Sequence, residues 1–204
     1  MKSIKIETVG RVSERNGELH AVGKCANGAQ GHIALTDVRG AVSPPAADTP
    51  GYWIIFGVKY GCNDKGKPVN MFMREGESKN HRRLIDDLSE AAGKYRAREI
   101  YCPESCGLYS TLVKKFWQVK GTFVRPAPHE SDIDFGVSLV ISALEDETLD
   151  IPRGTILHGQ LEQMTADNMG YTIHPLRYLL SAFQMYTPRR AGSSQVVKRS
   201  WYWG

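Results

Sequence analysis

The chain has 204 residues and a formal net charge of +4, with 41% hydrophobic and 24% charged residues. These values are those of an ordinary soluble globular protein, long enough for one good-sized domain plus extensions. The longest apolar run, YWIIFGV at 52–58, is too short to cross a bilayer, and the polar start MKSIKIETVGR does not predict a signal peptide.

The cysteines are sparse and irregularly spaced, which predicts reduced thiols in a cytoplasmic protein. Cys102 and Cys106 could form half of a zinc site, but no second pair of ligands stands at a convincing spacing.

The positive charge is concentrated at the end of the sequence. Residues 187–204 contain no acidic residue, and their four cations equal the whole net charge. A basic tail that ends in WYWG could bind phosphates and stack on bases, although an ordinary solvated tail is an equally good interpretation. The candidate nucleic-acid-binding residues of this tail are Arg189, Arg190, Lys198 and Arg199.

Alternating hydrophobicity and turn residues predict strands over 3–9, 18–24, 31–40, 52–61, 69–77, 98–105, 120–126 and 148–152. Helical periodicity predicts helices over 80–97, 107–117, 132–146, 155–165 and 175–186. A β meander followed by β/α alternation indicates a mixed sheet with helices on its faces. We expect its first three strands to be antiparallel and the later strands to be parallel.

Three residues stand where such a sheet would place functional groups. Asp37 ends the predicted strand 31–40, Glu104 ends the predicted strand 98–105, and His174 precedes the last helix. In a sheet of order 3-2-1-4-5 the first and fourth strands are neighbours, so Asp37 and Glu104 would lie side by side. Two adjacent carboxylates repel, and a divalent cation between them relieves the repulsion.

These motifs resemble, in order and spacing, the RNase H-like nuclease domain of phage terminase large subunits. The relevant stretches are ALTDVRG, GYWIIFGVKYG, REIYCPESCG, ETLDIP and IHPLRYLLSAF, and the resemblance covers roughly residues 31–186. It implies an α/β, RNase H-like mixed sheet at 31–186, preceded by a hairpin extension at 1–30 and followed by the basic aromatic tail at 187–204. The hairpin is free to pair with the sheet edge or with another chain.

The resemblance also implies hydrolysis of double-stranded DNA by a two-metal mechanism with Mg²⁺ or Mn²⁺. Carried over residue by residue, Asp37 and Glu104 become metal ligands, and His174 occupies the position of a third acid. A neutral imidazole binds Mn²⁺ well and Mg²⁺ poorly, so His174 is either a working ligand or the mark of a degenerate DNA-binding or packaging-associated module. Asp167 and Asp48 are reserve carboxylates.

Two further groups of cations are candidate DNA contacts. Arg82 and Arg83 begin the helix at 80–97, and Lys114, Lys115 and Lys120 flank an aromatic pair. The stretch GCNDKGKP nearly matches a phosphate-binding loop, but Pro68 replaces the hydroxyl residue and a hairpin turn is the wrong context. A terminase motor ATPase is therefore expected to be a separate partner.

Overall fold

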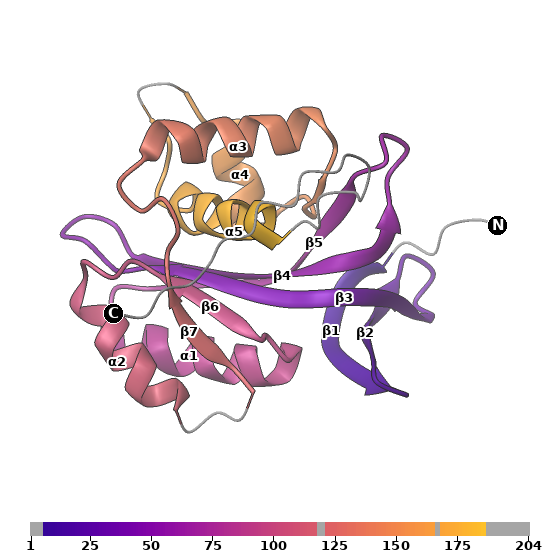
Figure 1. Cartoon of the computed structure of the whole chain (residues 1–204). Helices are drawn as coiled ribbons and strands as arrows, with labels where there is room; N and C mark the ends of the chain where they lie inside the picture. Colours follow the sequence, from indigo (N-terminus) through magenta and orange to yellow (C-terminus); the bar gives the residue numbers. More distant parts are fainter. Residues whose placement is uncertain (1–5, 118–120, 166–167, 187–204) are drawn as a thin grey trace, which may run out of the picture.

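The computed structural model describes residues 6–117, 121–165 and 168–186 (Figure 1). Its strands are β1 (Ile6–Arg15), β2 (Glu18–Cys25), β3 (Gln30–Ser43), β4 (Gly51–Cys62), β5 (Pro68–Ser78), β6 (Glu99–Cys102), β7 (Phe123–Pro126) and β8 (Leu149–Asp150). Its helices are α1 (His81–Tyr95), α2 (Gly107–Phe116), α3 (Ile133–Glu145), α4 (Ile156–Glu162) and α5 (Ile173–Tyr186).

The strands form one mixed sheet. Its main path is β1-β2-β3-β4-β5-β8, and β6 pairs with β3 while β7 pairs with β6. The five consecutive strands β1 to β5 pair antiparallel, whereas the β3–β6, β6–β7 and β5–β8 pairs are parallel. The order β5-β4-β3-β6-β7 confirms the predicted 3-2-1-4-5 arrangement, with β3 as its first strand.

One edge of β3 serves two partners. The first half of β3 pairs with β2, from Gln30 to Leu35, and the second half pairs with β6, from Arg39 to Ala41. The opposite edge pairs with β4 over nearly the whole second half. The unusual length of β3 therefore allows the hairpin β1–β2 and the parallel strand β6 to follow one another along the same edge.

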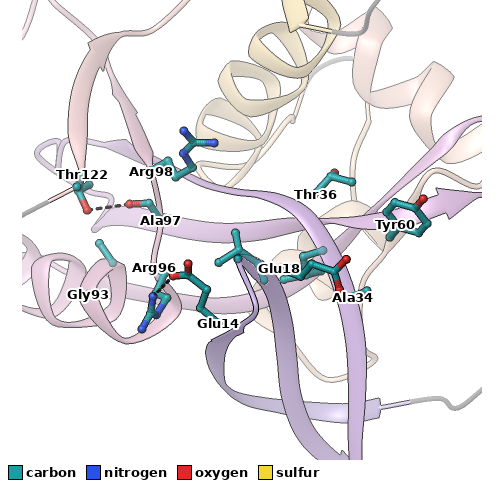
Figure 2. Close-up of a pocket in the computed structure, with 15 residues that line it drawn as sticks. Glu14, Glu18, Ala34, Thr36, Tyr60, Gly93, Arg96, Ala97, Arg98 and Thr122 are labelled. Atoms are coloured by element: carbon teal, nitrogen blue, oxygen red, sulfur yellow. Dashed lines mark hydrogen bonds and ion pairs between the residues drawn. The ribbon is translucent and has the colours of Figure 1, made fainter.

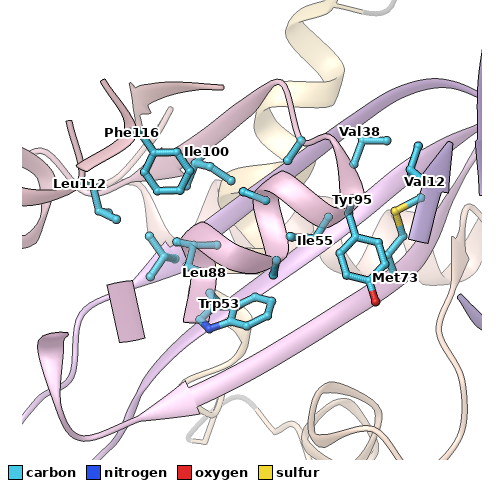
Figure 3. Close-up of a cluster of buried hydrophobic side chains, with 14 of the residues drawn as sticks. Val12, Val38, Trp53, Ile55, Met73, Leu88, Tyr95, Ile100, Leu112 and Phe116 are labelled. Carbon is cyan, nitrogen blue, oxygen red and sulfur yellow. The ribbon is translucent and has the colours of Figure 1, made fainter. Parts of the chain in front are cut away.

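Helices cover both faces of the sheet (Figure 1). Helices α1 and α2 lie against one face and α3, α4 and α5 lie against the other. The core under α1 and α2 includes Val38, Ile55, Leu88 and Ile100 (Figure 3). A second core packs α5 on the opposite face, because successive side chains of a strand point to opposite sides.

The N-terminal hairpin contributes to the first of these cores. Val9 and Val12 of β1 are buried among residues of β5 and α1, and the hydroxyl of Tyr95 donates to the carbonyl oxygen of Val9 at 3.2 Å. The hairpin turns at Asn16 and Gly17, whose φ angles of 52° and 81° are those a two-residue hairpin turn needs. This segment is part of the packed structure.

Two predicted boundaries were wrong in ways that matter for the site. Strand β3 continues past Gly40 to Ser43, because its last residues are buried between β4 and β6 and the chain first meets a proline at Pro44. Helix α5 begins at Ile173, which places His174 inside its first turn.

Candidate functional site

Asp37 lies within β3, six residues before the strand ends. Its carboxylate accepts from Arg39 Nε at 2.6 Å and from the Val38 backbone N–H at 2.9 Å. Arg39 is itself buried, donates to the carbonyl oxygen of Ala182 at 3.4 Å, and lies 5.3 Å from the ring centroid of Phe183. Asp37 is thus part of an ion pair beside the last turns of α5.

The register of the sheet separates Asp37 from Glu104. Arg39 pairs with Glu99 and Ala41 with Tyr101, so Glu104 is level with the residue that follows the end of β3. The two acids are offset by seven residues, about 20 Å along the strand direction at the usual rise. The prediction that they lie side by side was wrong, because it placed the end of the strand at Asp37.

His174 is also remote from Asp37. It lies in the first turn of α5, whereas Arg39 contacts Ala182 eight residues later, which corresponds to about 12 Å along a helix. Of the three residues predicted to form one site, Glu104 and His174 are linked indirectly, through Glu130 and Arg177, and Asp37 is not part of this link.

A chain of hydrogen bonds connects Glu104 with His174. The backbone N–H of Glu104 donates to Glu130 Oε2 at 2.9 Å, and Arg177 Nη2 donates to the carbonyl oxygen of Glu130 at 2.6 Å. Arg177 Nε also donates to His174 Nδ1 at 3.4 Å. Glu130 and Arg177 were not predicted, although Arg177 is one helical turn after His174 and Glu130 follows a predicted strand end.

Arg177 fixes the loop that follows β7. It is 3% exposed, and its Nη1 donates to the carbonyl oxygens of His129 and Asp132 at 3.1 and 3.2 Å. Together with its bond to Glu130, this guanidinium satisfies three backbone carbonyls in the loop. Such a planar donor group with five N–H bonds is suited to holding a loop in one conformation.

Ser43 is the last residue of β3, six positions after Asp37. Its side chain is on the α5 face, as is that of Ala41 two residues earlier, and its hydroxyl donates to the carbonyl oxygen of Tyr52 at 3.4 Å. The Tyr52 ring makes an edge contact of 5.8 Å with Tyr171, three residues before His174. Ser43 and His174 therefore belong to the same end of the sheet.

The electrostatics around His174 oppose a bound cation. Burial lowers the pKa of His174 below its ordinary value of 6.5, and the neighbouring Arg177 lowers it further. With Nδ1 accepting from Arg177, the neutral ring carries its proton on Nε2. Histidines that bind metals instead donate their second nitrogen to a carboxylate or a carbonyl.

Asp48 is an exposed residue in the loop between β3 and β4, at the same end of the sheet as Glu104. Asp167 lies outside the described residues. Across the described part of the chain, no group of three or more His, Cys, Asp and Glu side chains is arranged to hold a metal ion. The side chains of the described residues therefore show no arrangement that fits a two-metal site.

The two predicted basic groups meet at one acid. Arg82 and Lys115 both form ion pairs with Asp86, at 4.0 and 2.8 Å, and the hydrogen bond from Lys115 lowers the pKa of Asp86. Arg83 pairs with Asp87 at 3.6 Å, and Lys114 is exposed. Lys120 and the tail cations Arg189, Arg190, Lys198 and Arg199 lie outside the described residues.

No protein-family model and no curated protein sequence matches this chain. Among solved structures, it matches the large terminase nuclease from thermophilic phage G20c, a crystal structure with bound zinc. The match is to a terminase nuclease. It has a TM-score of 0.49 and 11% sequence identity, and it covers 88% of this chain and 94% of the other. At this identity it assigns no role to any residue here.

A cavity of about 840 Å³ opens beside the first half of β3, at the opposite end of the strand from Ser43, and Thr36 is among the residues that line it (Figure 2). It lies where β2 and β6 diverge, and its wall includes the ion pair between Glu14 and Arg96 at 2.5 Å. Tyr60 lines it and is 78% exposed. The helices described in the structure include none long and apolar enough to span a membrane.

Proposed function

We propose that this chain is an RNase H-like domain of the terminase-nuclease type that binds double-stranded DNA and has a degenerate catalytic site. The sheet order β5-β4-β3-β6-β7 and the order of the sequence motifs support the fold assignment. The observation that carries the loss of catalysis is the bond from Arg177 to His174 Nδ1. Arg177 is a cation that donates to Nδ1 of His174. In a metal-bound histidine, the nitrogen that does not bind the metal instead donates to a carboxylate or a carbonyl.

The positions of the acids support the same proposal. Asp37 is neutralised by Arg39, and the strand-end position is occupied by Ser43. Two-metal hydrolysis needs carboxylates that hold both ions on either side of one phosphate. Glu104 lies in the turn two residues after β6, which ends at Cys102 and not at the predicted residue 105.

DNA binding in this proposal rests on cations. Arg82 and Arg83 have side chains that are 93% and 76% exposed. The other candidate cations are the exposed Lys114 and the four cations in the sequence of 187–204. The acidic neighbours of the two arginines, Asp86 and Asp87, reduce the net field over α1, so we expect the tail to supply most of the phosphate contacts. A separate packaging ATPase is the protein partner that this role implies.

Metal-dependent cleavage by an endonuclease is the second candidate. The proximity of Asp48, Glu104 and His174 to one end of the sheet favours it, with Mn²⁺ preferred over Mg²⁺ if His174 is a ligand. Asp37 would then have to replace its bond to Arg39 with a bond to a metal ion, although it is offset along the strand direction from Glu104.

Plasmid cleavage by the purified chain with Mn²⁺ and with Mg²⁺ separates the two candidates. The proposal expects no cleavage and no saturable Mn²⁺ binding by calorimetry. It also expects duplex DNA binding that weakens steeply as the salt concentration rises. In a plot of log binding constant against log salt concentration, the magnitude of the slope should fall by up to about 3.6 when residues 187–204, with their four cations, are removed. Cleavage lost in His174→Ala and Asp37→Ala would establish the second candidate instead.

A further inference from the structure

Two of the cysteines are neighbours in the turn between β6 and α2. Cys102 ends β6, and Cys106 is the N-cap residue of α2. Their sulfur atoms are 3.9 Å apart. Both thiols donate to the carbonyl oxygen of Pro103, Cys102 at 3.6 Å and Cys106 at 3.0 Å. The two side chains therefore converge on one point of the turn.

The geometry of the turn permits a bond between them. A disulfide holds its sulfur atoms about 2 Å apart, so closure from the observed separation needs an approach of roughly 2 Å. Glu104 and Ser105, which lie between the two cysteines, are exposed and outside regular structure. Closure of the bond needs backbone adjustment at these residues, between the end of β6 and the start of α2.

The two thiols differ in access to solvent. Cys102 is completely buried, whereas Cys106 is half-buried and lines a cavity of about 640 Å³ between α1, α2 and the loop after β3. Apolar side chains including Pro45, Ile85 and Leu108 line the same cavity. A small reagent that enters it meets Cys106 before Cys102.

We infer that Cys102 and Cys106 form a reversible disulfide, in which Cys106 reacts first with a low-molecular-weight disulfide and Cys102 then resolves the adduct. The deprotonated sulfur of Cys106 attacks one sulfur of the oxidant, breaks its S–S bond and releases one thiolate. Burial raises the pKa of the Cys102 thiol, so this thiol gives up its proton as its sulfur attacks the Cys106 sulfur and releases the second thiolate. The cysteines lose two protons and two electrons, and the oxidant becomes two thiols.

The disulfide would close a ring around the turn that carries Glu104. The backbone N–H of Glu104 and the hydroxyl of Ser105 both donate to the carboxylate of Glu130, whose backbone carbonyl is held by Arg177. Oxidation therefore acts on the loop that joins the ends of β6 and β7. This inference is independent of whether the domain binds DNA.

The test is thiol mapping of the native full-length chain with glutathione disulfide as the probe. After incubation at increasing ratios of oxidised to reduced glutathione, free thiols are alkylated and the protein is digested with trypsin. Residues 99–114 contain Cys102 and Cys106 without an internal Lys or Arg, and Cys25 and Cys62 fall in other peptides. We expect both free thiols of 99–114 to disappear together, and we expect the peptide to carry no covalently attached glutathione.

Exposed Cys62 serves as an internal control for exposure to the oxidant. Two free thiols in 99–114, when Cys62 is fully modified, would overturn the inference, as would a stable glutathione adduct on that peptide in the wild-type chain. The order of reaction is tested by single variants. Cys102→Ser should retain glutathione on Cys106, and Cys106→Ser should leave Cys102 unmodified; the reverse pattern overturns the assigned order. The wild-type result does not depend on either variant.

Discussion

Arg39 Nε lies 2.6 Å from Asp37 Oδ2, and the two side chains are 9% and 18% exposed. Glu99 Oε2 is 3.6 Å from the same guanidinium nitrogen. Arg39 is thus the cation shared by two acids on the α5 face of the sheet. Asp37 therefore belongs to a partly buried ion pair within β3, six residues before the strand ends.

Removing the cation should cost more than removing the acid. We expect Arg39→Met to lower the free energy of unfolding by about 3 kcal/mol, because the partly buried carboxylate of Asp37 loses its cation, while Glu99 keeps Arg125 and the Tyr101 hydroxyl. We expect Asp37→Asn to cost roughly 1–2 kcal/mol, since Glu99 still pairs with Arg39. Urea denaturation of both single variants and the double variant measures the coupling. A stabilised Asp37→Asn protein with weaker Mn²⁺ binding would instead identify Asp37 as a metal ligand.

The lowered pKa of His174 predicts a loss of stability in mild acid. Because burial and Arg177 lower the pKa in the folded state below 6.5, the unfolded chain binds more protons as the pH falls through 6.5 toward the folded value. The free energy of unfolding should therefore fall with pH in this window. His174→Gln should reduce that dependence, and His81→Gln, at an exposed histidine of α1, is the matched control. Equal slopes in all three proteins would refute the prediction.

A metal site should be recoverable by substitution if the site is degenerate. We expect Ser43→Asp combined with His174→Asp to increase Mn²⁺ affinity at least about tenfold, because it places two new carboxylates at the sheet end that carries Glu104. Their repulsion should lower the melting temperature without metal, and Mn²⁺ should restore it.

Calorimetry and thermal melts with and without Mn²⁺ check this recovery. The control is Asn27→Asp combined with His32→Asp, which adds the same number of carboxylates at exposed positions near the start of β3, at the opposite end of the strand from Ser43. Equal Mn²⁺ affinity in the control and the designed variant would contradict the assignment of Ser43 and His174 to one site.

The N-terminal hairpin should contribute to stability as a core element. Val12 is 4% exposed and packs in the core that contains Met73 and Tyr95. Truncation by Val12→Ala should cost roughly 2 kcal/mol through lost burial and the cavity it leaves. Val113→Ala, at a position that is 37% exposed, should cost less than about 1 kcal/mol. If urea denaturation showed a similar loss in the free energy of unfolding for Val12→Ala and Val113→Ala, the hairpin would be loosely attached.

The strand order and the alternation of helices were predictable because each element carries its own periodicity. Strand β4 and helix α1, for example, are recognisable from a run of apolar residues and from buried positions three and four apart. The end of β3 was not predictable in the same way. Gly40 resembles a turn residue, but here it pairs within the sheet, with Ile55 and Ile100 on either side.

The parts of the candidate site that sequence reasoning missed depend on contacts between distant segments. Arg177 reaches Glu130 across 47 residues, and Arg39 reaches Ala182 across 143 residues. Nothing local distinguishes either arginine from a surface residue. Their burial follows only once α5 is packed on the sheet, so the tertiary structure decides which charged groups are available to a ligand.

The shared edge of β3 has a consequence for how the chain folds during synthesis. The pairs that strands β1 to β5 make among themselves join only neighbours in sequence, so this ribbon can form before β6 leaves the ribosome. Until then, the edge of β3 around Arg39 to Ala41 is an open strand edge, prone to pair with other nascent chains. Pulsed hydrogen exchange should show β2, β3 and β4 amides protected before those of β6; simultaneous protection would exclude this order.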